Sequence, residues 1–77
     1  MRIRVELQTY LARYAPDGAQ AFELEVPQGA TVRSIIRRLD IPEEMAGVIV
    51  VNGQSEELET ALNVGDRVTL IPPLSGG

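Results

Sequence analysis

Two stretches in the first third of the chain alternate between apolar and polar residues, which is the period of a half-buried β-strand. Odd positions are apolar in residues 3–7, and even positions are apolar in residues 22–26. The stretch from Tyr10 to Tyr14 indicates a loop or a short helical turn, and we expect both tyrosines to pack against the domain. Residues 16–18, Pro-Asp-Gly, mark a turn. Because the link between them is short, the two alternating stretches predict an antiparallel hairpin.

The next segment changes to a helical period. The apolar residues of 32–39 recur at i, i+3, i+4 and i+7, which predicts a helix with one stripe facing a core. Thr31 is a suitable N-cap, because its hydroxyl can accept from an otherwise unpaired backbone amide. Pro42 ends the helix, and Glu43 and Glu44 after it favour one further short helical turn.

The second half of the chain predicts three more segments. Residues 48–51 are all β-branched and apolar, which indicates a central strand buried on both faces. Asn52-Gly53 is a strong hairpin turn. Residues 54–62 are polar and irregular, with Leu58 and Leu62 as apolar anchors.

The last strand is predicted over residues 67–71, with Val68 and Leu70 on one face and Ile71 on the other. One helix covers only one face of a sheet. We therefore predict an α+β fold of the β-grasp, ubiquitin-like architecture. It has a mixed sheet, one main helix packed on one face, and the first and last strands paired at the centre.

Composition narrows the classes of function. The 77 residues are enough for one small domain, and they include no cysteine and no histidine. The net charge is −4, and all seven basic residues are arginines scattered along the chain. Such a domain lacks the concentrated basic face that binds nucleic acid, so we expect protein partners. No leader and no apolar run of about 20 residues is visible, so we expect a cytoplasmic protein with no membrane partner.

The sequence ends in Pro-Pro-Leu-Ser-Gly-Gly. We predict a domain over residues 1–71 and a flexible tail over residues 72–77. The two glycines suggest that the working group is the last carboxylate, because a side chain at either position would hinder threading through a narrow channel. The two prolines stiffen the base of the tail and so lower the entropy lost on insertion.

Several short segments occur in an order that is specific in combination. They are the opening strand, residues 11–14, 27–32, 51–53, 62–68 and 71–77. Over essentially its whole length the chain resembles the ubiquitin-like sulfur carriers of the MoaD/ThiS type. The Pro-Pro before the tail is most similar to the small, sulfur-carrying subunit of molybdopterin synthase. Those subunits often have apolar residues where this chain has Gln8 and Ser55, so part of the usual docking patch is polar here.

The resemblance implies a mechanism. An adenylyltransferase of the ubiquitin-activating type joins the Gly77 carboxylate to AMP, and a sulfurtransferase converts the product to a thiocarboxylate. The large synthase subunit then uses the sulfur to build the pterin dithiolene that holds molybdenum or tungsten. Ile71 is expected to dock the partners. The residues expected to thread into them are Gly76, Ser75, Leu74, Pro73 and Pro72.

The domain itself is expected to bind no cofactor and no metal and to supply no catalytic residue. A free α-carboxyl has a pKa of about 3.3–3.7, so at neutral pH it is ionised and needs activation, for which the partner consumes ATP. Arg33 and Arg37 share a helix face and are expected to be solvated rather than to bind an anion. The acidic residues Glu56, Glu57 and Glu59 are likewise expected to be solvated rather than to hold a metal.

Other functions stay open on the sequence. The sulfur acceptor can instead belong to thiamine synthesis, tRNA thiolation or sulfur amino acid synthesis. The chain can also be a protein modifier conjugated through Gly77, or a ubiquitin-like interaction module whose tail has no chemical role.

Overall fold

A computed structural model describes residues 1–73, which form one five-stranded sheet, one α-helix and two short 3-10 helices. No helix within the described residues is long and apolar enough to cross a bilayer. In chain order the elements are β1 (Arg2–Leu7), η1 (Thr9–Tyr14), β2 (Ala21–Glu25), α1 (Val32–Arg38), η2 (Glu43–Met45), β3 (Val48–Val51), β4 (Gln54–Ser55) and β5 (Arg67–Ile71).

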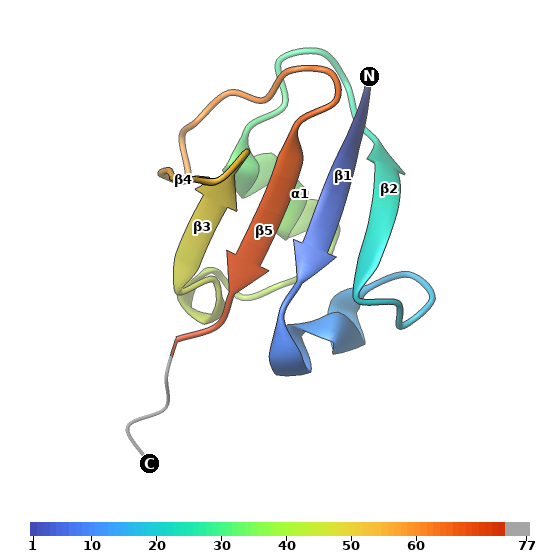
Figure 1. Ribbon diagram of the computed structural model, residues 1–77, viewed down its shortest axis with the longest axis vertical. Coiled ribbons are helices and arrows are strands. Elements are labelled where there is room, and N and C mark those ends of the chain that lie inside the picture. Colours follow the sequence, from blue (N-terminus) through green and yellow to red (C-terminus); the bar gives the residue numbers. More distant parts are fainter. Residues whose placement is uncertain (74–77) are drawn as a thin grey trace.

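The sheet is mixed, with the strand order β2-β1-β5-β3-β4. β1 pairs antiparallel with β2 and parallel with β5, and β5 pairs antiparallel with β3. In Figure 1 α1 lies behind the sheet, and the opposite face carries no helix. The α+β β-grasp prediction is confirmed, including the central pairing of the first and last strands.

α1 begins at the predicted place because two side chains cap it reciprocally. The Thr31 hydroxyl accepts from the Ser34 backbone N–H, and the Ser34 hydroxyl accepts from the Thr31 N–H. Val32, Ile35 and Ile36 of the predicted stripe are buried. Because the stripe faces the sheet, truncating Ile36 to Ala is expected to cost about 2–5 kcal/mol of stability.

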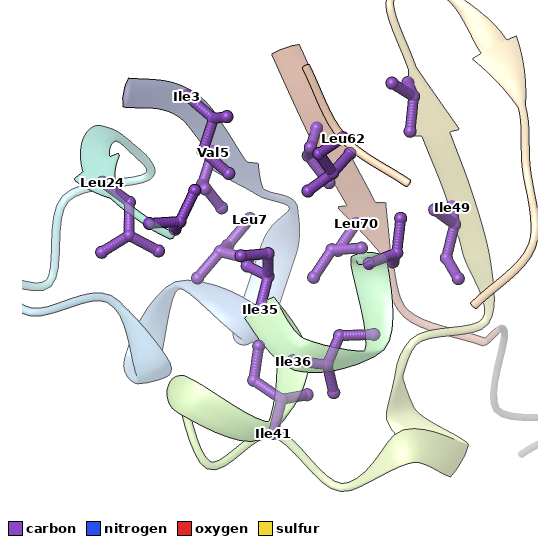
Figure 2. Close-up of a cluster of buried hydrophobic side chains, with 14 of the residues drawn as sticks. Ile3, Val5, Leu7, Leu24, Ile35, Ile36, Ile41, Ile49, Leu62 and Leu70 are labelled. Carbon is purple, nitrogen blue, oxygen red and sulfur yellow. The ribbon is translucent and has the colours of Figure 1, made fainter. Parts of the chain in front are cut away.

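The core lies between α1 and one face of the sheet, as Figure 2 shows. β1 contributes its odd residues to the core, β5 contributes Val68 and Leu70, and α1 contributes Ile35 and Ile36. Leu62 anchors the irregular segment before β5 and is 4% exposed. The alternating patterns read from the sequence therefore place the correct residues inside.

Two predictions about burial are wrong. Residues 48–51 do not form a strand buried on both faces, because α1 covers only one face: Val48 is 44% exposed and Val50 is half-buried. β3 is also not central, since only the two-residue β4 lies beyond it. Tyr10 is 44% exposed on η1, whereas Tyr14 packs against the core as expected.

The start of β5 is fixed by a buried carboxylate. Asp66 is 9% exposed, and its two carboxylate oxygens accept from the Asn63 backbone N–H and the Asn52 side-chain amide, each at 2.8 Å. The Asn52 side-chain carbonyl accepts in turn from the Arg67 N–H at 2.9 Å. The Asp66 backbone carbonyl accepts from the N–H of Arg4 on β1. These bonds hold the loop before β5 to the β3–β4 turn and to β1.

Candidate functional site: the end of β5 and the open face of the sheet

The predicted tail begins where β5 ends. Ile71 is the last residue of β5, and it pairs with Val48 at the start of β3. Pro72 is buried and Pro73 is exposed. Neither proline has a backbone N–H, so neither can donate a hydrogen bond to β3 and extend the β5–β3 ladder. Figure 1 shows the chain leaving β5 beside the start of β3.

The predicted reactive residue and most of the threading residues lie outside the described part of the chain. These are Leu74, Ser75, Gly76 and Gly77. Of the predicted site residues, the structure therefore describes the docking residue Ile71 and the tail base, Pro72 and Pro73.

Gly47, which sequence analysis did not identify, lies against the base of the tail. A Cβ atom placed on Gly47 would lie 2.6 Å from the Pro73 backbone nitrogen and 2.8 Å from its Cα. It would also lie 3.1 Å from the Pro72 carbonyl carbon. The two segments touch backbone to backbone, and a glycine preceding an apolar strand gives no signal of this contact in the sequence.

An apolar patch, formed by Val48, Val50 and Ile71, lies on the open face next to the tail base. Ile71 is 36% exposed, as the alternation in β5 predicted. Its register partner Val48 was wrongly predicted as buried, and Val50 pairs with Thr69 one step further along β5. Hydrophobic β-branched side chains on a solvated sheet face are suited to contact a second protein surface.

The opposite end of the same face is charged. A shallow depression of about 400 Å³ is lined there by residues of β1, β2, β5 and the loop before β5, namely Arg2, Ile3, Arg4, Glu23, Val64, Gly65 and Arg67. Arg2 lies 3.8 Å from a Glu23 carboxylate oxygen, and Arg4 lies 3.7 Å from one of Glu6. Exposed ion pairs of this kind stabilise by about 0–1 kcal/mol, so this end is a solvated charged surface.

One carboxylate at this end has a shifted pKa. The Met1 amine donates to the Val26 carbonyl at 2.6 Å and lies 3.3 Å from a Glu25 carboxylate oxygen. This hydrogen-bonding, positively charged amine lowers the pKa of Glu25 below its usual 4.5, and Arg2 adds a smaller effect in the same direction. The shift reflects a local ion pair at the edge of the sheet.

The charged residues around α1 neutralise one another. Arg33 lies 3.2 Å from a Glu43 carboxylate oxygen and 3.1 Å from one of Glu59, and Arg37 lies 3.7 Å from Glu43. Glu56 accepts a hydrogen bond from Thr60. Within residues 1–73, no group of three or more possible metal ligands comes together. Ion pairs thus link α1 to η2 and to the segment before β5 on this side of the domain.

The described residues thus present an exposed apolar patch beside the point where the chain leaves β5. Gln8 is half-buried and Ser55 is exposed, so both polar departures lie at positions that the solvent can reach.

Comparisons with known proteins agree with this fold. The sequence profile of the ThiS family matches residues 9–77. A search of curated proteins found no match. The fold resembles the crystal structure of SAMP1 from Haloferax volcanii, with a TM-score of 0.74 and 23% identity over all of both chains. It also resembles a putative molybdopterin converting factor, subunit 1, from Pyrococcus furiosus, with a TM-score of 0.74 and 25% identity over 96% of this chain and 99% of that one.

A third similar structure is a complex of subunits 1 and 2 of the molybdopterin-converting factor from Helicobacter pylori. The match has a TM-score of 0.63 and 24% identity and covers all of both chains. At this level of identity, the Helicobacter and Haloferax matches establish the shared fold alone.

Proposed function

The chain belongs to the ThiS family, and from this we propose that it is a sulfur carrier whose Gly77 carboxylate is adenylated and then converted to a thiocarboxylate. The observation that carries the proposal is the family match, which extends through residue 77 and so includes the Gly-Gly end. The exit of the tail beside the apolar patch supports it, because a partner held on the patch has the tail within reach.

The chemistry requires a partner. A terminal carboxylate is ionised at neutral pH and does not react with nucleophiles. An adenylyltransferase of the ubiquitin-activating type transfers AMP from ATP to the carboxylate and releases pyrophosphate. A persulfide sulfur of a sulfurtransferase then displaces AMP and forms an acyl disulfide. A thiol of a partner attacks the sulfurtransferase sulfur of this bond, which forms a disulfide and releases the thiocarboxylate. In the first step the Gly77 carboxylate is itself the nucleophile, and it attacks the α-phosphorus of ATP. The chain has no histidine and no cysteine, and we assign the acid–base groups and the sulfur nucleophile to the partners.

The domain contributes binding energy and the position of the tail. Ile71, Val48 and Val50 dock the partner surface, and Pro72 and Pro73 start the tail in a restricted conformation. Because a proline has its φ angle fixed, less conformational entropy is lost when residues 72–77 enter a channel. Fully extended, these six residues reach at most about 20 Å, which suffices to enter a buried site while the domain stays outside.

For the acceptor we propose a molybdenum or tungsten pterin pathway, with the large synthase subunit as partner. Two comparisons support this choice. The Pyrococcus protein, at 25% identity, is described as a molybdopterin converting factor, subunit 1. The Helicobacter structure shows a protein of the same fold in complex with its subunit 2. Thiamine synthesis, tRNA thiolation and sulfur amino acid synthesis use the same carrier chemistry and are the alternatives.

A second candidate function is a ubiquitin-like protein modifier, joined through Gly77 to lysines of other proteins. The likeness to small archaeal modifier protein 1 from Haloferax volcanii favours it. Both functions begin with adenylation of the same carboxylate and differ in whether sulfur or an amine displaces AMP. This chain has no lysine of its own, so its side chains offer no amine to its activated end.

Intact-mass spectrometry tests the proposal. The protein is incubated with ATP, an activating enzyme of the same source and a sulfur donor, with a variant lacking Gly77 as the control. A carrier exchanges one oxygen for sulfur, and the exchange is absent from the control. Covalent adducts on other proteins, without that exchange, would establish the modifier instead. No change with an activating enzyme that is active on another carrier would contradict both.

A further inference from the structure

Gly47 occupies the position opposite the first residue of the tail. β3 and β5 pair in the register Val48 with Ile71 and Ile49 with Leu70. Continuing this register by one residue places Gly47 opposite Pro72. Because hydrogen-bonded and non-hydrogen-bonded pairs alternate from the Asn52–Arg67 pair, the next hydrogen-bonded pair would join residues 46 and 73, and Pro73 has no N–H to donate. Hydrogen bonds of the β3–β5 ladder therefore cannot fix the direction of the chain after Ile71, and packing must do so.

The contact at Gly47 has no room for a side chain. The Pro73 nitrogen and Cα would lie 2.6 and 2.8 Å from an added Cβ, and contacts under about 3 Å force a shift of one group. Both atoms belong to the backbone, so no side-chain rotation relieves the overlap. Gly47 is also not among the residues with positive φ. An alanine at position 47 therefore needs no left-handed backbone conformation, and the three atoms nearest to its Cβ all belong to the tail base.

We propose that Gly47 is a positioning residue, which sets the direction of the tail by letting Pro72 and Pro73 lie directly against the η2–β3 connection. This inference rests on the proposed function for its consequence, since the direction of the tail matters only if Gly77 must reach a reactive centre. Nothing in the Gly-Gly signature or in the apolar patch assigns a role to residue 47.

A small change at the tail base has a large effect at its end. An extended segment of four residues, the length from Leu74 to Gly77, spans at most about 14 Å, so a deflection of its base by about 20° would displace its end by up to about 5 Å if a partner holds the segment straight. A displacement of about 1 Å can lower the rate of a reaction in a preorganised site by about 100-fold. The apolar patch lies on the paired strands β3 and β5, outside the deflected segment, so we expect docking to change less than delivery of the tail. The inference therefore predicts that a change at residue 47 affects the rate of reaction at Gly77 more than the affinity for the partner.

The test is Gly47→Ala, assayed for AMP transfer by the activating enzyme. We expect kcat to fall by about tenfold or more, with KM within about twofold of wild type, because docking is preserved and tail delivery is not. Gly18→Ala is the matched control. Its added Cβ meets nothing within 4 Å, although its φ of +71° makes alanine strained there. Gly18→Ala should therefore lose stability and keep the kcat of wild type.

A structural readout makes the inference independent of the proposed function. Residual dipolar couplings of the Cα–Hα bonds of residues 71–73 report the direction of the tail base. They are measured by NMR on wild type and Gly47→Ala. We expect a change at Pro72 and Pro73 and none in β1. If wild type accepts no AMP, the proposed function fails, and the couplings alone decide the inference. Unchanged couplings, or an unchanged kcat in a protein that is activated, overturn the role of Gly47.

A second variant covers the case in which Gly47→Ala does not fold. Pro73→Gly leaves residue 47 untouched, removes the ring and frees the φ angle at the same contact. It should lower kcat and leave KM and the melting temperature close to wild type. A kcat equal to that of wild type in Pro73→Gly would overturn the inference.

Discussion

The two ends of β5 are built in opposite ways. At its start, Asp66 and Asn52 make a closed set of hydrogen bonds that includes the Arg67 N–H and holds the strand to its neighbours. At its end, two prolines without N–H groups follow Ile71, and the facing residue is a glycine. Polar bonds anchor one end, and the other is positioned by packing against backbone.

This difference predicts that stability depends on one end of a five-residue strand and the proposed function on the other. Changes at the start of β5 should affect folding and leave the activity of each folded molecule intact. Changes beyond its end should affect activity and leave folding intact. The following variants test this separation, from the largest expected effect to the smallest.

Removing Gly77, or adding a residue after it, is expected to abolish AMP transfer while leaving the free energy of unfolding unchanged. The reacting carbon that we propose is that of Gly77, and the hydrophobic core of the described residues ends at Leu70. Gly76→Val is also expected to block activation, because a β-branched side chain restricts the backbone that enters the channel. Pyrophosphate exchange and urea unfolding measure the two properties. Normal AMP transfer to an extended chain without prior trimming would contradict the account.

Asp66→Ala should have the reverse effect. It removes the acceptors of the Asn63 N–H and the Asn52 amide. A hydrogen bond to a charged group contributes about 1.5–3 kcal/mol, and less where water can take its place, as at these two exposed residues. We expect a loss of about 2–4 kcal/mol in urea unfolding. AMP transfer per folded molecule should equal that of wild type. Asp17→Ala, at an exposed turn, is the control and should change stability by less than about 0.5 kcal/mol.

Ile71→Glu lies between these extremes, since Ile71 belongs to the strand and borders the tail. A carboxylate at the centre of an interface must be desolvated, so we expect the Kd for the activating enzyme to rise at least tenfold, which is about 1.4 kcal/mol. Val64→Glu is the matched control, because Val64 is 72% exposed at the charged end of the same face. A large loss of stability with unchanged affinity would show that Ile71 belongs to the core instead.

The smallest expected effect concerns Glu25. Its pKa is lowered in the folded state, so its pair with the Met1 amine stabilises the fold above the unfolded pKa of about 4.5. That contribution is lost as the pH falls through the lower, folded pKa. Glu25→Gln should therefore lower the melting temperature slightly at pH 7. The melting temperature of this variant should also fall less than that of wild type between pH 7 and pH 3, as measured by thermal melts at pH 7, 5 and 3. Glu23→Gln, which leaves the amine pair intact, should decline in acid as wild type does.

Much of the fold could be predicted because local patterns and tertiary packing agree. The alternation in residues 3–7 and 67–71, the i, i+3, i+4 stripe of α1 and its Thr31 cap each specify one face toward the core. The error at Val48 has a physical cause. A run of four β-branched residues does not reveal which face a single helix will cover.

The sequence predicted the part of the site that follows from alternation within one strand. It did not predict the part that depends on contacts between segments distant in the sequence. Ile71 was correctly placed on the open face, because alternation in a strand fixes its direction. Gly47 was missed, because its contact with Pro72 and Pro73 joins segments 25 residues apart through the register of β3 and β5. The roles of Gly77 and the other threading residues stay predictions.

The central claim is that the carboxylate of Gly77 is the group that reacts. Tandem mass spectrometry of the protein after incubation with ATP, its activating enzyme and a sulfur donor tests this claim most directly. The account predicts that the mass change from oxygen to sulfur occurs only in fragments that contain Gly77, and that fragments covering residues 1–73 keep their original masses. A modified fragment that lacks Gly77, or sulfur incorporation into a chain without Gly77, would contradict it.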